Sequence, residues 1–395
     1  MNQALEGIKV LDLTRVLAGP YATMILADLG ADVIKIEMPN IGDDSRQFGP
    51  FVGEESAYFM SLNRNKRSIT LNLKSETAKG LFVEMIKEAD VVVENFRPGT
   101  MEKLGLGYDE LKKINPRIIY AASSGFGHTG PYSKRAAYDG VVQAMGGIMS
   151  ITGEKNGKPT RVGPSIGDIA AGMFTSIGIL AALQYRNVTG VGQKVDVAML
   201  DCQVAILENA ISRYVVTGEI PNPAGNRHSS IVPFEPFETV DGEIMIAAGN
   251  DTLWTKLCEV MERRDLADHE FFKTNLLRNT NYDILRPMIA EAIKTKTTYE
   301  WQEILDRVGV PNGPINTVDK VLQDPQVIAR EMIVEIEHPV AGRLKMPGVP
   351  VKLSETPGSI RRPAPLLGQH TEEILKEILG FTNEKIDELM KENIF

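Results

Sequence analysis

Short apolar runs alternate with segments of helical periodicity along the first half of the chain. The runs at residues 8–13, 32–37, 68–73, 90–96, 117–123 and 194–200 predict buried strands. The periodicity between them predicts helices at 21–29, 75–89 and 169–185, the last nearly uncharged. Strand–helix–strand units of this kind have parallel strands, so residues 1–218 are expected to form a large, Rossmann-like α/β domain.

The pattern changes after Gly218, where Pro221, Pro223 and Gly225 indicate a linker. A hairpin at 237–248, turning at residues 241–242, and helices at 252–261 and 298–308 predict a smaller α+β domain over residues 225–325. Residues 326–395 are expected to return to the large domain. They contain a second hairpin, turning at 341–342, and two amphipathic helices at 371–379 and 383–392.

Composition narrows the class of protein. The 395 residues carry 43 basic and 52 acidic side chains, a net charge of −9, which argues against binding to nucleic acid or to an anionic membrane. No run reaches the roughly 18 apolar residues of a membrane span. The five histidines show no metal-ligand spacing. Two cysteines, Cys202 and Cys258, lie in apolar helical patterns, and the start of the chain has no basic leader, so we expect buried free thiols and a cytoplasmic protein.

Asp168 is the strongest candidate for chemistry. It follows Gly167 at the start of the long apolar helix, where free backbone N–H groups and the helix dipole favour an ionised carboxylate. Such a carboxylate can act as a nucleophile. Helix capping, a common role of acidic residues, is an equally good interpretation at this point.

A group of basic residues indicates a site for a phosphorylated ligand. Arg64, Lys66, Arg67 and Lys74 fall in a stretch without acids, and Arg97 and Lys103 follow the strand at 90–96. Ligands of open α/β sheets bind beyond the carboxyl ends of the strands, and arginine and lysine pair well with phosphate. Phe96 could stack on a base. The alternative is solvated surface charge with Phe96 in the core.

Two further features remain open. The segment 125–130 matches G-x-G-x-x-G, but it continues as a loop from Pro131 onward rather than opening a helix, which argues against a nicotinamide or flavin enzyme. Asp139, preceded by Tyr138, begins another helix. Its carboxylate could share a cleft with that of Asp168, and the repulsion between them would then push their two pKa values apart. Alternatively, the two acids could be independent helix caps.

The order and spacing of several motifs resemble those of class III CoA-transferases, the CaiB/BaiF family. They cover nearly the whole chain: residues 12–20, 30–37, 63–68, 94–99, 124–127, 167–168, 309–315 and 365–370. The resemblance implies a Rossmann-like large domain, a small domain and two ring-like chains interlocked as a homodimer. It also implies coenzyme A and acyl-CoA as substrates, with no permanently bound cofactor and no metal.

The resemblance assigns the nucleophile to Asp168. It implies that CoA contacts fall on the following residues: Leu17, Ala18, Leu71, Asn72, Leu73, Lys74, Asn95, Phe96, Arg97, Lys103, Ala136, Ala137, Tyr138 and Asp139. The donor acyl group would first form an anhydride with the aspartate, and CoA would then form a thioester with it. The acceptor acid would go through the same two steps in the opposite order. Backbone N–H groups near Gly167 or in the loop 247–250 are candidates for stabilising the oxyanion.

The C-terminal third is closest to the branch that acts on dicarboxylates. Arg46 could bind a distal carboxylate, or it could pair with Asp43 or Asp44. Ala248, Gly249 and Asn250 would lie near the acid substrate, but they replace a run of glycines in the formyl-CoA transferase branch, which argues against a glycine lid and against oxalate. The alternatives are an α-methylacyl-CoA racemase of the same fold, which places a histidine where Tyr138 stands here, and a non-catalytic CoA-binding protein.

Overall fold

The computed structural model describes residues 3–392 and 394–395. The chain divides into two compact units. The first contains residues up to 149, residues 161–218 and the chain from 325 onward, and the second contains residues 150–160 and 219–324. The first unit is therefore interrupted by a long excursion that leaves near Gly218 and returns at residue 325, with a short piece of chain before Asp168 also belonging to the second unit.

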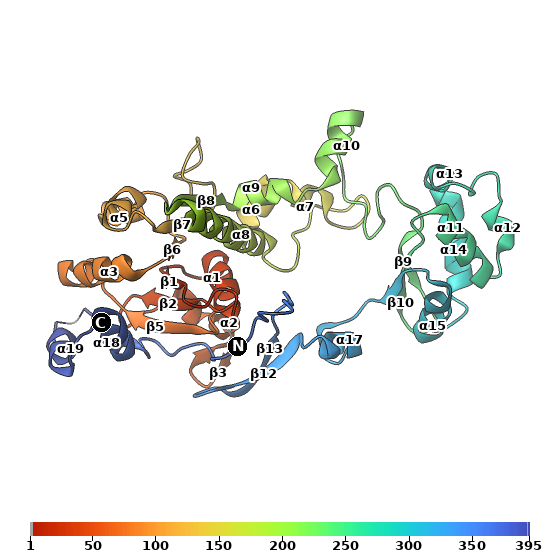
Figure 1. The fold of residues 1–395 in the computed structure, drawn as a ribbon. Coiled ribbons are helices and arrows are strands. Elements are labelled where there is room, and N and C mark those ends of the chain that lie inside the picture. The colour runs from red at the N-terminus through yellow and green to blue at the C-terminus, as the bar shows by residue number, and fades with distance from the viewer. Residues whose placement is uncertain (1–2, 393) are drawn as a thin grey trace. The chain divides into compact units, whose positions relative to one another are not determined.

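A six-stranded parallel sheet forms the centre of the first unit (Figure 1). Its order is β5-β2-β1-β6-β7-β8. The strands are β1 (Lys9–Asp12), β2 (Asp32–Glu37), β5 (Lys66–Thr70), β6 (Val91–Glu94), β7 (Ile119–Ser124) and β8 (Lys194–Ala198). The chain winds one way from β1 to β5 and the other way from β6 to β8, so the switch point where such sheets bind ligands lies between β1 and β6.

Helices cover both faces of this sheet. Val10, Val33 and Val91 pack on one face against α1 (Ala18–Asp28) and α8 (Ile166–Thr189). The alternate strand positions Leu11, Ile34 and Val92 face the other layer. That layer contains α3 (Glu76–Glu88), α5 (Tyr108–Ile114), α18 (Thr371–Leu379) and α19 (Asn383–Met390). Two covered faces explain why the strands are continuous apolar runs.

The predicted strands and helices of this unit are confirmed, with shifted ends. β5 begins at Lys66, two residues before the predicted start, because Lys66 and Arg67 are buried in ion pairs rather than left in a polar loop. α8 extends from Ile166 to Thr189, beyond the predicted 169–185.

By length and composition alone α8 could cross a membrane, which corrects the expectation that no segment of the chain is apolar enough. Half of its most apolar stretch is buried inside the structure, and the helix packs along α1, as a core helix does.

The smaller elements complete the first unit. The C-terminal hairpin of β12 (Ile333–His338) and β13 (Gly342–Pro347) is antiparallel, as predicted. The backbone N–H of His370 donates to the carbonyl of Ser68 at 2.9 Å, so the C-terminal segment covers the edge strand β5. The other elements are η1 (Asp44–Gln47), β3 (Phe51–Val52), β4 (Glu55–Ser56), α2 (Ala57–Leu62), α4 (Thr100–Lys103), α6 (Asp139–Met145), α9 (Met199–Ala205), α10 (Asn209–Thr217) and α17 (Pro325–Ala329). The short helix α7 (Ile148–Ile151) has two residues in each unit.

The second unit is α+β. Strands β9 (Phe234–Glu238), β10 (Glu243–Ala247) and β11 (Asn312–Pro314) form an antiparallel sheet, and the β9–β10 hairpin turns at residues 241–242 as predicted. Trp254 and Trp301 are fully buried in its core. Its helices are α11 (Asp251–Val260), α12 (Arg264–Ala267), α13 (Asn275–Thr280), α14 (Tyr282–Ile293), α15 (Thr298–Val308) and α16 (Val318–Val321).

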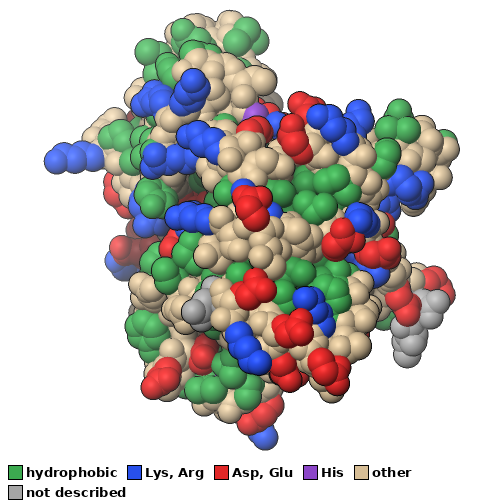
Figure 2. All heavy atoms as spheres, turned by 90° about the vertical axis from the view of Figure 1, so that its left-hand side faces the viewer, with side chains coloured by type: hydrophobic (Ala, Val, Ile, Leu, Met, Phe, Trp, Pro, Cys, Tyr) green, Lys and Arg blue, Asp and Glu red, His purple; other side chains and the backbone are tan. Residues whose placement is uncertain are grey.

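Charge is mixed on the surface. Over the face shown in Figure 2, acidic and basic side chains are interspersed with apolar and uncharged atoms. A phosphate site therefore has to be a local group of cations, and the contacts of individual lysines and arginines decide where it lies.

Candidate active site

Asp168 is the third residue of α8 and lies half-buried in its first turn. The N-cap of the helix is Ser165, and among the described residues no group donates a hydrogen bond to the Asp168 carboxylate. Asp168 is therefore not the cap of this helix, which was one of its two predicted roles. Its carboxylate stays available to react.

The acid that holds the start of α8 is Asp139, the first residue of α6. One Asp139 oxygen accepts the backbone N–H of Gly167 at 2.9 Å, and the other accepts the Gln143 side-chain amide at 2.8 Å. The Gln143 carbonyl oxygen in turn accepts the N–H of Val162 at 2.9 Å. The two helix-start acids thus share one place, with Asp139 fixed by protein donors and Asp168 left without any. The Gly167 N–H is used here, so it is not free for the oxyanion role suggested by the sequence.

The electrostatics of Asp168 follow from this arrangement. Burial, and then the negative charge of Asp139, raise the pKa of the Asp168 carboxyl to about 7. These two effects outweigh the helix N-terminus, which was expected to favour the ionised form. A carboxylate with a raised pKa is more basic and more weakly solvated, and both properties make it a better nucleophile.

Tyr58, in α2, was not predicted from the sequence and belongs to the same region. Burial raises the pKa of its phenol, and so do the negative charges of three carboxylates, those of Asp168, Asp43 and Asp139. The ring packs edge-on against Phe48 at 5.6 Å between centroids. Its place at the start of a short helix gave no signal, because only the tertiary fold brings α2 near the start of α8.

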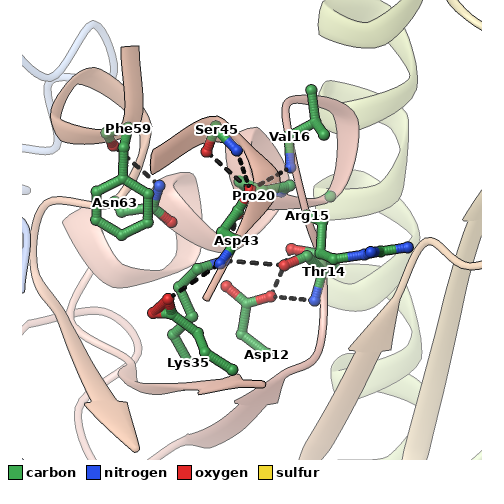
Figure 3. Close-up of polar contacts among 12 residues, drawn as sticks. Asp12, Thr14, Arg15, Val16, Pro20, Lys35, Asp43, Ser45, Phe59 and Asn63 are labelled. Atoms are coloured by element: carbon green, nitrogen blue, oxygen red, sulfur yellow. Dashed lines mark hydrogen bonds and ion pairs between the residues drawn. The ribbon is translucent and has the colours of Figure 1, made fainter. Parts of the chain in front are cut away.

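The loop between β1 and α1 is fixed by side chains from several elements (Figure 3). Asp12 accepts the N–H of Thr14 at 2.9 Å, and Asp43 accepts the N–H of Val16 at 3.0 Å. Val16 has a φ of 66°, an uncommon conformation for a β-branched residue, so this loop is held against its local preference.

A buried ion-pair network lies beneath that loop. The Lys35 ammonium contacts Asp43 at 2.9 Å and the Thr14 carbonyl at 2.8 Å, and Lys66 contacts Asp12 at 3.0 Å. Burial alone would raise the pKa of Asp43, but Lys35 and the surrounding hydrogen bonds hold it below its ordinary value. Both carboxylates stay ionised and keep the loop in one shape.

Two pockets lie at the carboxyl ends of the strands, and the larger of them lies at the switch point between β1 and β6. The larger, of about 390 Å³, lies beyond β1, β2, β5 and β6, and the smaller, of about 150 Å³, lies beyond β6 and β7. Phe96 lines both. The larger pocket is lined by six residues of the predicted CoA set: Leu71, Asn72, Leu73, Lys74, Phe96 and Lys103. The smaller is lined by five more: Asn95, Arg97, Ala136, Ala137 and Tyr138.

Four cations at these pockets have no acidic partner among the described residues: Lys74, Arg97, Lys103 and Arg135. The Arg135 guanidinium instead lies 4.7 Å from the centre of the Tyr132 ring. The larger pocket also exposes acids, but each is neutralised: Glu37 by Arg46, Asp43 by Lys35 and Asp44 by Arg15. The positive charge that remains suits phosphate groups. Leu17 and Ala18, the other predicted CoA contacts, are buried at the start of α1, and the Ala18 carbonyl lies close to Gly172 of α8.

The other basic residues of the predicted phosphate site serve the fold instead. Arg64 pairs with Asp28 at 2.7 Å, and Arg67 pairs with Asp32 at 2.6 Å and also with two glutamates of α18. Lys66 is fully buried against Asp12. Neither predicted interpretation, phosphate binding or solvated surface charge, is correct for these three, because their partners come from distant parts of the chain.

The predicted acid-substrate residues are placed as follows. Arg46 pairs with Glu37 through two hydrogen bonds of 2.7 and 2.8 Å, rather than with Asp43 or Asp44, and its guanidinium lies 3.7 Å from the centre of the Phe59 ring. Binding a distal carboxylate would require it to leave Glu37. Ala248, Gly249 and Asn250 lie in the second unit, where the Asn250 side chain caps α11 by accepting the N–H of Leu253 at 2.9 Å. Their role toward substrate stays a prediction.

Comparison with known proteins defines the class. A family model described as CoA-transferase family III matches residues 5–371. The human succinyl-CoA:glutarate CoA-transferase is 43% identical over 99% of this chain and 89% of its own length. The acetyl-CoA:oxalate CoA-transferase of Acetobacter aceti is 45% identical over 94% of this chain and 95% of its own. The crystal structure of a CAIB/BAIF family protein from Brucella suis matches with a TM-score of 0.84 and 40% identity, covering 96% of this chain and all of that one. The chain belongs to CoA-transferase family III, and it is a CoA-transferase.

Proposed function

We propose that this CoA-transferase moves CoA from an acyl-CoA donor to a small dicarboxylic acid, with Asp168 as the nucleophile. The observation that carries the proposal is the Asp168 carboxylate itself. It is half-buried, lacks a hydrogen-bond donor among the described residues and has a pKa raised to about 7. The pockets with the four cations that lack an acidic partner give the nucleotide end of acyl-CoA a place in the same unit.

The reaction proceeds through two kinds of covalent intermediate. An Asp168 oxygen attacks the donor thioester carbon, the C–S bond breaks, and CoA thiolate leaves with its electron pair to give an aspartyl anhydride. The thiolate then attacks Cγ of Asp168 and expels the donor acid, leaving an aspartyl thioester. The acceptor carboxylate attacks Cγ and expels the thiolate, which finally attacks the acceptor acyl carbon and releases Asp168. Each intermediate keeps the energy of a thioester provided that water is excluded.

The dicarboxylate part of the proposal rests on the relatives. Their names join succinyl-CoA to glutarate or mesaconate, and acetyl-CoA to oxalate. A mass-spectrometric screen of succinyl-CoA and acetyl-CoA against glutarate, mesaconate, oxalate and monocarboxylates of matching length should show transfer to dicarboxylates. Transfer only to monocarboxylates would contradict the proposal. α-Proton exchange in deuterated water without any acceptor acid would favour the racemase alternative.

The pH dependence of the chemical step tests the role of Asp168. Because only the carboxylate attacks, the single-turnover rate at saturating acyl-CoA should fall as the pH falls through about 7. Asp139→Asn removes the like charge, so it should lower the pKa of Asp168 and shift this acidic side of the pH–rate profile, the acid limb, to lower pH. The maximal rate at high pH should also be lower, because the hydrogen bond from Gln143 to this side chain is lost. Asp201→Asn, at an exposed acid of α9, should leave the limb in place. An unshifted limb in Asp139→Asn would contradict the electrostatic coupling.

We further propose a homodimer. The outer face of α8 exposes Met173, Phe174, Ile177, Tyr185 and Val188, an apolar stripe unusual for a free surface. Sedimentation should therefore show a dimer, and Ile177→Glu should dissociate it while Gln184→Glu, beside the stripe, should not. A monomeric parent protein would contradict this.

The buried free thiols of Cys202 and Cys258 support a reducing compartment, and we propose that the protein is located in the cytoplasm.

A further inference from the structure

A buried carboxyl lies beneath the wall that separates the two pockets. Glu94, the last residue of β6, is 2% exposed. One of its oxygens accepts the backbone N–H of Phe96 at 2.7 Å, and the other accepts the Tyr120 hydroxyl at 3.2 Å. Burying a carboxyl is costly unless donors surround it, so a buried carboxyl at this point is expected to have a role.

His128 places a further donor near this carboxyl, just beyond hydrogen-bond distance. Its Nδ1 lies 3.0 Å from the Lys194 ammonium, which can only donate, so Nδ1 accepts and Nε2 carries the proton. Nε2 lies 3.6 Å from the Glu94 oxygen that Tyr120 also contacts, and it has no hydrogen-bond partner among the described residues. The His128 backbone N–H is held by Asp196 at 3.1 Å. The Nε2–H of His128 thus lies next to Glu94 without a hydrogen-bond partner of its own among the described residues.

The turn that Glu94 holds is the one that presents the pocket residues. Phe96 lines both pockets, and Asn95 lines the smaller. The Asn95 side chain exchanges two hydrogen bonds with the backbone of Arg15, of 2.8 and 2.7 Å, which joins this turn to the loop after β1. The Arg15 guanidinium lies 5.2 Å from the centre of the Phe96 ring. Releasing the Phe96 N–H would therefore disturb both walls of the pocket.

We propose that Glu94 is a positioning residue for CoA, holding the Asn95–Phe96 turn in its binding shape with His128 as the partner that favours its ionised form. This inference rests on the proposed function only in taking these pockets as the CoA site.

The ionised form is the one that matches the surroundings. Phe96 N–H, Tyr120 O–H and His128 Nε2–H are all donors, so a protonated Glu94 would meet donors only. Burial, and to a smaller extent the nearby Glu102, raise the pKa of Glu94 to about 7, against the Phe96 N–H, Tyr120 and Lys194, which lower it. Burial and Lys194 lower the pKa of His128, against Asp196 and Glu102, so the ring stays neutral. CoA should bind more weakly as the pH falls through about 7.

Equilibrium binding of CoA tests this without the chemistry of Asp168. In an Asp168→Ala background, the dissociation constant of CoA at pH 6 should be roughly tenfold larger than at pH 8, the size of losing one charge-assisted hydrogen bond. Adding Glu94→Gln should make binding weak at both pH values. Glu88→Gln, the same change at an exposed residue of α3, should leave the pH dependence intact. The 3′-phosphate of CoA titrates near pH 6, so 3′-dephospho-CoA is measured in parallel to separate its contribution.

A second pair of variants keeps the test independent of folding at position 94. His128→Phe removes the Nε2 donor, so the pH at which half of the CoA affinity is lost, the binding midpoint, should rise. His128→Gln keeps a donor at this position and should return the midpoint to the value of the parent protein. Unchanged CoA affinity at pH 8 in Glu94→Gln, or a pH dependence that persists in it with 3′-dephospho-CoA, would overturn the positioning role. An unmoved midpoint in His128→Phe would overturn the part assigned to His128. Failure of the Asp168→Ala parent to bind CoA at any pH would instead overturn the assignment of the pockets.

Discussion

Asp168→Asn should reduce CoA transfer by at least about 10⁴-fold, because the amide cannot attack a thioester. The neighbouring Asp139 carboxylate is not expected to replace it, since both of its oxygens are held by hydrogen bonds from Gly167 and Gln143. Transfer is measured as acceptor acyl-CoA formed, by chromatography with mass detection. The unaltered enzyme, incubated with acyl-CoA and then with hydroxylamine, should carry a hydroxamate on Asp168. The variant should carry none.

The control for this change is another acid-to-amide replacement on an exposed helix. Asp201→Asn in α9 should keep its activity, since the side chain is exposed to solvent. Asp168→Asn should still bind CoA, and this binding would show that the pockets are still formed. Turnover that survives in Asp168→Asn, or a hydroxamate mapped to another residue, would refute the assignment.

Local pattern was enough to predict most of the scaffold. The run Val91–Val93 and the segment 32–37 appear as central strands because both faces of the sheet are covered, which leaves an unmistakable apolar signal. The same logic placed Asp168 at a helix start and Arg97 and Lys103 at the carboxyl end of β6. Each of these inferences depends only on residues that are close together in the sequence.

The errors concern pairs that are distant in sequence. Arg67 meets Asp32 and α18, and Arg64 meets Asp28, so neither arginine is free to bind a phosphate. A charge run has the same appearance in a sequence whether its partners are ligands, solvent or residues far along the chain. The division of labour between Asp139 and Asp168 could not be predicted for the same reason, since the bond from Gly167 to Asp139 spans 28 positions.

Because of that hydrogen bond and the close packing around it, Gly167→Ala should also lower the transfer rate strongly. A Cβ at Gly167 would lie 2.8 Å from Cγ2 of Val142 and 3.1 Å from the Asp139 oxygen that accepts the Gly167 N–H. Val142 is fully buried and β-branched within a helix, so its side chain cannot rotate away. The first turn of α8 would have to move, and Asp168 with it. A displacement of about 1 Å at a reacting group can cost about 10²-fold in rate, and we expect kcat to fall by about that factor.

Two comparisons separate this strain from other causes. Gly163→Ala adds the same methyl group four residues earlier, where no atom lies within 4 Å of the new Cβ, so it should leave kcat unchanged. Val142→Ala removes the clashing methyl, so the double variant with Gly167→Ala should recover much of the lost rate, giving a coupling energy that neither single variant predicts. If Gly167→Ala turned over normally, or if Val142→Ala gave no recovery, the position of Asp168 would not depend on the contact between α6 and α8.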